Sequence, residues 1–116
     1  RQAAANALDA GFDGVELHCT SGYLPMQFLC SDTNQRTDEF GGSAKNRAKF
    51  AAQCVVAMAA VFGEGRVGLR MNPGNRFNDT NDENPEQTFS ALLTEINSFN
   101  LAYLHVIRFP PGRLDV

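Results

Sequence analysis

The sequence contains no tryptophan, only three cysteines and no long apolar run. Its longest near-continuous apolar stretch, residues 54–62, is far shorter than the roughly 20 residues of a membrane-spanning helix, and no charged-then-apolar leader opens the chain. The cysteines lack the paired C-x-x-C spacing of zinc sites, so we expect reduced thiols rather than a disulfide framework. These absences predict a cytoplasmic protein with no metal site and no membrane anchor.

Positive charge is also scarce, with 10 Lys and Arg against 13 Asp and Glu and a formal net charge of −3. No basic stripe is visible, so the sequence offers no electrostatic surface for nucleic acid or for an anionic membrane. What is present is an ordinary apolar content of 43%, which is typical of a globular chain that buries a core.

Helical and strand patterns alternate along the chain. The apolar spacing predicts four helices and three strands: helices over residues 1–10, 24–29, 44–62 and 85–99, and strands over residues 13–18, 66–71 and 103–107. Ser43 and Asn84 are expected to cap two of the helices, and Gly63 to end one. This rhythm requires crossover connections, so it predicts an α/β fold with a parallel sheet.

Two segments at strand ends are candidates for function. The first strand ends at His18, and Ser21 and Tyr23 follow within five residues, with Gly22 allowing a tight turn between them. The second strand is followed by the Gly-, Pro- and Asn-rich loop 72–84, a length more often functional than idle. Because parallel α/β folds place their chemistry at the carboxyl ends of strands, His18 predicts a site there.

Several motifs then give a specific resemblance. Residues 3–107 resemble the middle portion of old yellow enzymes, the flavin-dependent ene-reductases. The motifs are AAANALDAGFDGVELH, the Gly-Tyr-Leu turn with Gln-Phe-Leu after it, NQRTDEFGGSAKNR, RVGLRMNP and LAYLHVIR. The resemblance implies a TIM (β/α)8 barrel, in which these three strands would be the fourth to sixth. Residues 1–116 would then form a partial FMN-dependent barrel domain, with N- and C-terminal parts of the barrel outside this sequence.

The same resemblance implies a chemistry. NADPH or NADH would reduce FMN, and the reduced flavin would give hydride to the β-carbon of an activated alkene such as an enone. His18 would donate a hydrogen bond to the substrate carbonyl oxygen, and Tyr23, which as a phenol keeps its proton at neutral pH, would protonate the α-carbon. Arg70 and His18 would contact the flavin. Ser21 would bind substrate at a position where the family usually has Asn or His, and its shorter reach predicts weaker enone activity or a changed substrate.

Other polar residues are expected to be structural. Glu16 would fill a polar barrel core or pair with an arginine, and His105 would be a satisfied core histidine. Arg36, Asp38 and Glu39 would fix their loop, and Asn46 and Arg47 would anchor the following helix to that loop. The acidic cluster Asp79–Glu83 lacks the spacing of a calcium loop and would be solvated.

Two alternatives remain open from the sequence. The chain can be a catalytically silent half-barrel that acts through self-association, because three strands cannot close a barrel or cover both sheet edges. It can also be part of another flavin or sugar-phosphate barrel, although such a barrel would lack the NQRTDEFGG loop. The preferred interpretation is a segment of a flavin-dependent oxidoreductase acting on a small alkene, with no nucleic-acid or membrane partner.

Overall fold

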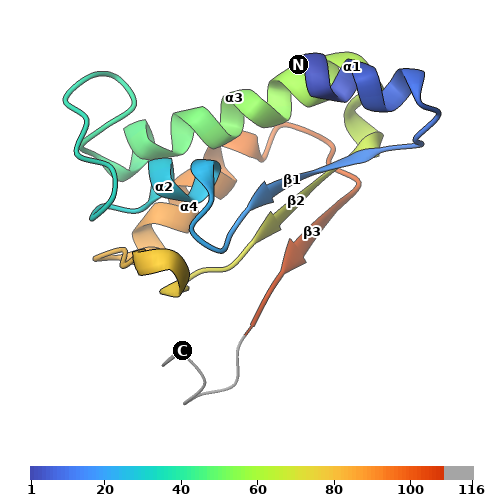
Figure 1. The fold of residues 1–116 in the computed structure, drawn as a ribbon. Helices are drawn as coiled ribbons and strands as arrows, with labels where there is room; N and C mark the ends of the chain where they lie inside the picture. The colour runs from blue at the N-terminus through green and yellow to red at the C-terminus, as the bar shows by residue number, and fades with distance from the viewer. Residues whose placement is uncertain (109–116) are drawn as a thin grey trace.

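A three-stranded parallel sheet with helices on one face forms the described part of the chain, residues 1–108 of the computed structural model (Figure 1). The strands, hydrogen-bonded in chain order, are β1 (Val15–Cys19), β2 (Val67–Met71) and β3 (Tyr103–Val106). The α-helices are α1 (Gln2–Asp9), α2 (Leu24–Leu29), α3 (Ala44–Phe62) and α4 (Pro85–Ile96), and two short 3-10 helices are η1 (Glu64–Arg66) and η2 (Phe77–Asp79). The α/β class predicted from the sequence is confirmed.

Local signals set the ends of the longer helices where the sequence predicted them. The Ser43 side chain accepts a hydrogen bond from the backbone N–H of Asn46 at the start of α3, and Gly63 ends α3 with a φ of 85°. Asn84 caps α4 in the same way, and Pro85 occupies its first turn. Helix α4 ends at Ile96, three residues earlier than predicted, and strand β3 ends at Val106 rather than Ile107.

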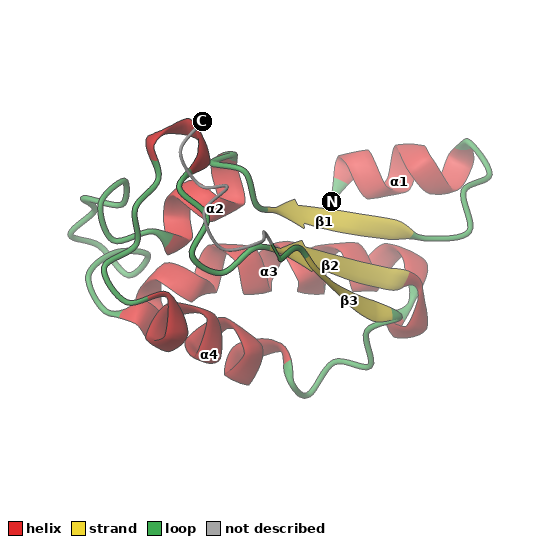
Figure 2. Ribbon diagram, turned by 90° about the horizontal axis from the view of Figure 1, so that it is seen from below, coloured by secondary structure: helices red, strands yellow, loops and turns green. Residues whose placement is uncertain are grey.

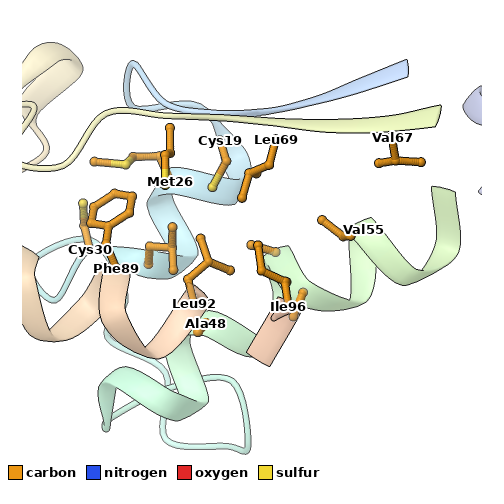
Figure 3. Close-up of a cluster of buried hydrophobic side chains, with 14 of the residues drawn as sticks. Cys19, Met26, Cys30, Ala48, Val55, Val67, Leu69, Phe89, Leu92 and Ile96 are labelled. Atoms are coloured by element: carbon orange, nitrogen blue, oxygen red, sulfur yellow. The ribbon is translucent and has the colours of Figure 1, made fainter. Parts of the chain in front are cut away.

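The core lies between the sheet and the helices α2, α3 and α4. Val67, Leu69 and Cys19 point from the sheet toward Leu92 and Val55 on α4 and α3, as Figure 3 shows. All five of these side chains have no measurable solvent exposure. Because each buried aliphatic side chain of this size contributes roughly 1.5–3 kcal/mol, this layer fixes the sheet on the helices.

Alternation along the strands sends a different set of residues to the other face. That face carries six residues in two rows across the sheet: Glu16, Gly68 and Tyr103 in one row, and His18, Arg70 and His105 in the next. Figure 2 shows α3 and α4 together on the opposite side of the sheet. The polar face is therefore available for ligands, as the inner face of a barrel is near its carboxyl end.

Strand β3 is only partly covered within the described residues. Leu104 and Val106 point to the helix side of the sheet, yet they are 47% and 52% exposed.

At the other edge of the sheet, an apolar groove of about 420 Å³ runs between α1, β1 and α3. Among residues 1–108, no helix is both long and apolar enough to cross a membrane.

Candidate active site

Strand register places two of the candidate residues side by side. His18 in β1 pairs with Arg70 in β2, and Arg70 pairs in turn with His105 in β3. Paired residues of a parallel sheet send their side chains to the same face, so the three form one polar row. His18 and Arg70 each lie one residue before the carboxyl end of their strand. The sequence predicted His18 as the last residue of its strand, but β1 continues to Cys19.

A tight turn brings Tyr23 back toward this row. The backbone N–H of Tyr23 donates to the carbonyl of Thr20 at 3.2 Å, and the two residues between them have positive φ, 58° at Ser21 and 73° at Gly22. Positive φ values at both central residues of a turn closed by such a hydrogen bond are typical of a type I′ turn. The ring centroids of His18 and Tyr23 consequently lie 5.4 Å apart, with their planes inclined by 49°.

The same turn gives Ser21 an unfavourable backbone. Only glycine enters the left-handed region freely, and Asn tolerates it better than Ser does. Gly22 has a second reason to lack a side chain, since a Cβ there would lie 2.6 Å from the Cβ of Asn78 and 2.8 Å from the carbonyl oxygen of Phe77. Loop 72–84 therefore packs directly on the turn that carries Ser21 and Tyr23.

Arg70 has an unused donor. Its Nε is buried and has no hydrogen-bond partner among residues 1–108, although the side chain as a whole is half-buried. A buried guanidinium N–H without an acceptor is costly unless a ligand or another segment supplies one. The residue thus fits a group that presents oxygen or nitrogen acceptors beside His18, as the edge of a flavin ring does.

Beside Arg70, three polar residues form a second cluster: His105 from the same row, and Glu16 and Tyr103 from the next row. The Nδ1 of His105 lies 3.1 Å from Oε2 of Glu16, and the Tyr103 phenol also bonds to Glu16, which raises the pKa of that phenol above its usual value. The Tyr103 ring crosses Gly68, where any Cβ would overlap it. Of the two roles predicted for Glu16, an arginine partner is absent within residues 1–108, while its place on the polar face is compatible with the other, a polar barrel core. His105 is satisfied by Glu16 but is not buried, with 46% of its side chain exposed.

Of the residues predicted to fix the loop before α3, some do so and one does not. Arg36 pairs with Asp38, whose carboxylate also accepts from the backbone N–H of Phe40, so these two residues fix their loop as expected. Glu39 is exposed and has no hydrogen bond or ion pair among residues 1–108. Asn46 contributes through its backbone N–H, which donates to the capping hydroxyl of Ser43.

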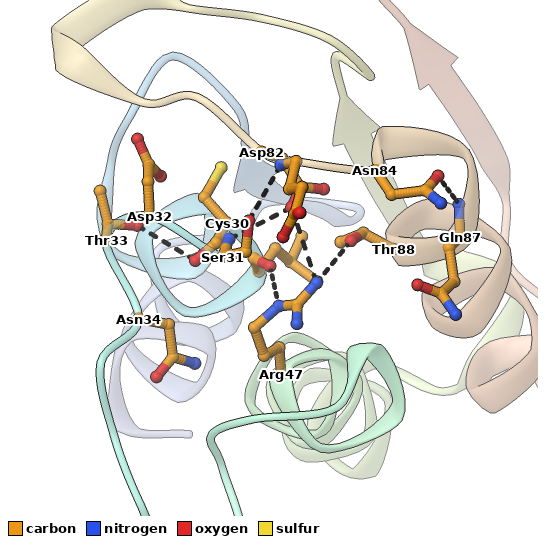
Figure 4. A network of polar contacts seen from close by, with 12 residues as sticks. Cys30, Ser31, Asp32, Thr33, Asn34, Arg47, Asp82, Asn84, Gln87 and Thr88 are labelled. Carbon is orange, nitrogen blue, oxygen red and sulfur yellow. Dashed lines mark hydrogen bonds and ion pairs between the residues drawn. The ribbon is translucent and has the colours of Figure 1, made fainter.

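Arg47 is the centre of the polar network drawn in Figure 4. Its Nε donates to the carbonyl of Leu29 at 2.7 Å and its Nη2 to Oγ1 of Thr88 at 2.8 Å, while Asp82 lies 3.6 Å away. The prediction that the 79–83 cluster is solvated is wrong for Asp82, whose side chain is 2% exposed and accepts from the backbone N–H of Ser31. The local sequence is polar, but the buried arginine supplied by α3 makes burial of this carboxylate possible.

The cysteines do not form a metal site. Burial raises the pKa of the Cys19 and Cys30 thiols to about 12, and it also raises the pKa of Cys54. All three are free, and no group of three or more metal-ligating side chains occurs within residues 1–108. Thiols of this kind are unreactive packing residues.

The parallel α/β sheet, together with its match to morphinone reductase at a TM-score of 0.87 and 43% identity, defines the class of fold: the chain is part of a (β/α)8 barrel. The chain belongs to the NADH:flavin oxidoreductase / NADH oxidase family, whose model matches residues 1–110. The resemblance to old yellow enzymes is confirmed by a homologue of old yellow enzyme from Zymomonas mobilis, with a TM-score of 0.87 and 35% identity over 90% of this chain and 30% of that one.

Three relatives are reductases by name. A "Probable flavin mononucleotide-dependent alkene reductase" of Leishmania infantum is 46% identical over 96% of this chain and 31% of its own length. The 12-oxophytodienoate reductase 2 of Arabidopsis thaliana is 45% identical over 92% of this chain and 29% of its own. Morphinone reductase in complex with tetrahydroNAD has a TM-score of 0.88 and 45% identity over 96% of this chain and 31% of that one. The chain thus spans about a third of the length of the relatives it matches.

Sequence reasoning did not single out the contacts that hold the site together. Asn78 donates from its side-chain amide to the carbonyl of Ser21 at 2.7 Å, and Gln27 donates to the carbonyl of Gly22 at 2.6 Å. The available signal was loop 72–84 itself, which follows the strand next to β1 and so reaches the same edge of the sheet. The polar row also gains His105, which the sequence assigned to the core.

Proposed function

We propose that the full-length protein, meaning the complete polypeptide that contains these residues, is an FMN-dependent ene-reductase driven by NADPH or NADH. The overall change would add two hydrogens across an activated C=C bond: one nicotinamide hydride and one proton are consumed, and NAD(P)⁺ leaves. The observation that carries the proposal is the placement of His18 beside Arg70, with Tyr23 folded back over His18. Membership of the flavin oxidoreductase family supports it.

The residues present fit FMN. Arg70 would hold the flavin, because its buried Nε has no acceptor among residues 1–108, and His18 would contact it from the next strand. A permanent cation at that position favours an anionic ring. When bound, FMN would accept hydride from the nicotinamide and pass it to the β-carbon of the alkene.

His18 and Tyr23 would act on the alkene itself. His18 would donate a ring N–H to the carbonyl oxygen, stabilising the negative charge that develops there. The Tyr23 phenol would hold a proton at Oη and deliver it to the α-carbon. The phenol is 55% exposed on the described surface, so a substrate can reach it directly.

Ser21 would limit this reaction. Its hydroxyl can donate to the same carbonyl oxygen, but from a shorter side chain than the Asn or His usual in the family. Loss of one such donor costs about 2.7–4 kcal/mol of activation free energy where measured. We therefore expect slow turnover of simple enones, or a substrate whose carbonyl lies closer to the turn.

Anaerobic half-reactions of the full-length protein test this function. The protein should copurify with FMN, lose its 450 nm flavin absorbance with NADPH or NADH, and regain it with 2-cyclohexen-1-one. Absence of bound FMN would reject the ene-reductase. So would a reduced flavin that oxygen reoxidises but that neither 2-cyclohexen-1-one nor another activated alkene reoxidises.

A second function is favoured by the uncovered surfaces. Leu104 and Val106 are about half exposed, and the groove beside β1 is apolar, so the 116-residue chain by itself could be a catalytically silent half-barrel that associates with further copies. Flavin titration of the purified chain, with its mass measured by light scattering, separates the two. An assembly that binds no FMN supports the silent half-barrel, whereas a monomer, or an assembly that binds FMN, opposes it.

We also propose a cytoplasmic location. The three free cysteines, two of them fully buried in the core, suit a reducing compartment. Fractionation of cells producing the tagged full-length protein would test this, and recovery in a membrane or secreted fraction would contradict it.

A further inference from the structure

Two side-chain amides from different elements hold the Thr20–Tyr23 turn. Asn78, in the loop after β2, donates to the carbonyl of Ser21 at 2.7 Å. Gln27, in α2, donates to the carbonyl of Gly22 at 2.6 Å. These are the two central residues of the turn, and both have positive φ. The carbonyls of Ser21 and Gly22 are therefore each fixed by a donor from a different element.

The Asn78 donor is itself held in place. Asn78 has a φ of 56°, a left-handed conformation in which Asn is among the best-tolerated residues. The loop around it is tied to the segment after α2, because Asp32 accepts from the backbone N–H of Asn81 at 2.6 Å and Ser31 from that of Glu83 at 2.9 Å. Its buried carboxylate, Asp82, lies against Arg47. The loop thus presents Asn78 to the turn from a fixed base.

We infer that Asn78, with Gln27 as its counterpart, is a positioning residue of the active site: the amide holds the turn in the conformation that places Tyr23 against His18. This inference rests on the proposed function, in which Tyr23 supplies a proton. Neither amide donates a hydrogen bond to the side chain of Tyr23 or His18 within residues 1–108, so both act through the backbone of Ser21 and Gly22. An error of about 1 Å in such a group can cost about a hundredfold in rate.

The test compares three variants of the full-length protein. Asn78→Gly removes the amide but accepts the positive φ, so backbone strain does not confuse the result. Gln27→Met removes the second donor and keeps the length and helix preference of the side chain. Asn81→Gly is the control, because Asn81 lies exposed on the same loop and only its backbone makes a bond, which glycine retains.

Two readouts separate positioning from general damage. Reoxidation of the reduced flavin by 2-cyclohexen-1-one should fall about tenfold or more in Asn78→Gly and Gln27→Met, while flavin reduction by NADPH or NADH stays within about twofold, since that step needs no proton from Tyr23. Amide hydrogen exchange at Tyr23, whose N–H closes the turn, should quicken in both variants and not in the control.

Each other outcome has a meaning. An unchanged alkene step with unchanged exchange overturns the inference, and so does an equal fall in both half-reactions, which would indicate a structural role alone. If no alkene reoxidises the reduced flavin of the wild-type protein, the proposed function fails. The comparison of amide exchange rates at Tyr23 then still decides whether Asn78 holds the turn.

Discussion

The rings of His18 and Tyr23 lie 5.4 Å apart although five positions separate them in a chain that has just left an extended strand. Only a reversal of the backbone can bring them together, and the positive φ values of Ser21 and Gly22 provide it. The acid and the carbonyl-binding donor proposed for the reaction therefore depend on one four-residue turn.

Tyr23→Phe tests the proposed proton donor. The variant keeps the ring that packs on His18 and loses only the hydroxyl, so the fold should be unchanged. Because general acid catalysis typically contributes about 10²–10⁴-fold, we expect the alkene half-reaction of the full-length protein to slow by that amount while flavin reduction continues. Stopped-flow absorbance measures both steps.

The other tyrosine of this chain is the control for that prediction. Tyr103→Phe should leave the alkene step unchanged, because the Tyr103 hydroxyl bonds to Glu16 within its own row, which is not the row of His18. Equal losses in the two variants would contradict a specific role for Tyr23.

Ser21→Asn should improve both stability and activity. Asn fits the φ of 58° better than Ser, which we expect to stabilise the full-length protein by about 1 kcal/mol. Its amide also reaches further toward a substrate carbonyl, so kcat/KM for 2-cyclohexen-1-one should rise. Urea unfolding and steady-state kinetics measure the two effects.

Ser43→Asn makes the matched comparison for Ser21→Asn. Ser43 caps α3 with an extended backbone, and Asn is an equally good cap, so neither stability nor kcat/KM should change. If Ser21→Asn behaves like this control, the positive φ at Ser21 is not a strain that limits the enzyme.

The secondary structure was predictable because its signals are local. The cap at Ser43, the positive φ at Gly63 and the apolar spacing between them define α3 within the chain itself. The site was predictable only in part. His18 lies one residue before the end of its strand and Tyr23 follows Gly22, so both could be found from local signals. The bond from Asn78 to Ser21 spans 57 positions and depends on how two loops meet.

Burial of polar residues was the least predictable feature. Asp82 lies in a stretch of Asn, Asp and Glu, a composition that predicts a solvated loop. The guanidinium that pairs with the buried Asp82 carboxylate comes from Arg47, on a helix 35 positions earlier. The prediction for His105 was wrong in the opposite direction: a residue expected in the core is exposed, because its partner Glu16 lies on the open face of the sheet. Which face a charged residue occupies is decided by tertiary partners that no local pattern contains.

Arg47→Met should be the most destabilising of the substitutions considered. It removes the donors to Leu29 and Thr88 and leaves the buried Asp82 carboxylate without its cation. Breaking a buried pair from one side typically costs about 3–5 kcal/mol, so the urea midpoint of the full-length protein should fall markedly. Adding Asp82→Asn should recover part of that loss, because the second charge is then gone.

Arg36→Met is the control for the buried pair. Arg36 and Asp38 form an exposed ion pair, with 48% of each side chain accessible, and exposed pairs contribute little to stability. A loss as large as that of Arg47→Met, or no recovery in the Arg47→Met/Asp82→Asn double variant, would contradict the account of the Arg47 network.

Glu16→Gln tests the cluster on the polar face through the titration of Tyr103. The hydrogen bond to the Glu16 carboxylate, together with the negative charge of that group, raises the pKa of Tyr103 above its usual 10.0. The neutral amide lacks that charge, so the pKa should move back toward 10.0. The 295 nm difference titration between each background and its Tyr103→Phe variant isolates this phenol in the full-length protein.

The raised pKa of Tyr103 makes the stability of the folded protein depend on pH. Between the unfolded and folded pKa values of Tyr103 the folded state binds more proton, so the contribution of this phenol is complete below about pH 10 and is lost as pH rises through the folded value. In Glu16→Gln the folded and unfolded pKa values of Tyr103 should lie closer together. Titration of Tyr103 should therefore account for less of the stability that this variant loses at alkaline pH than it does in the wild type. Glu64→Gln, an exposed change at η1, should leave the titration unmoved, and a Tyr103 midpoint that is the same with and without the Glu16 charge would show that the two groups are not coupled.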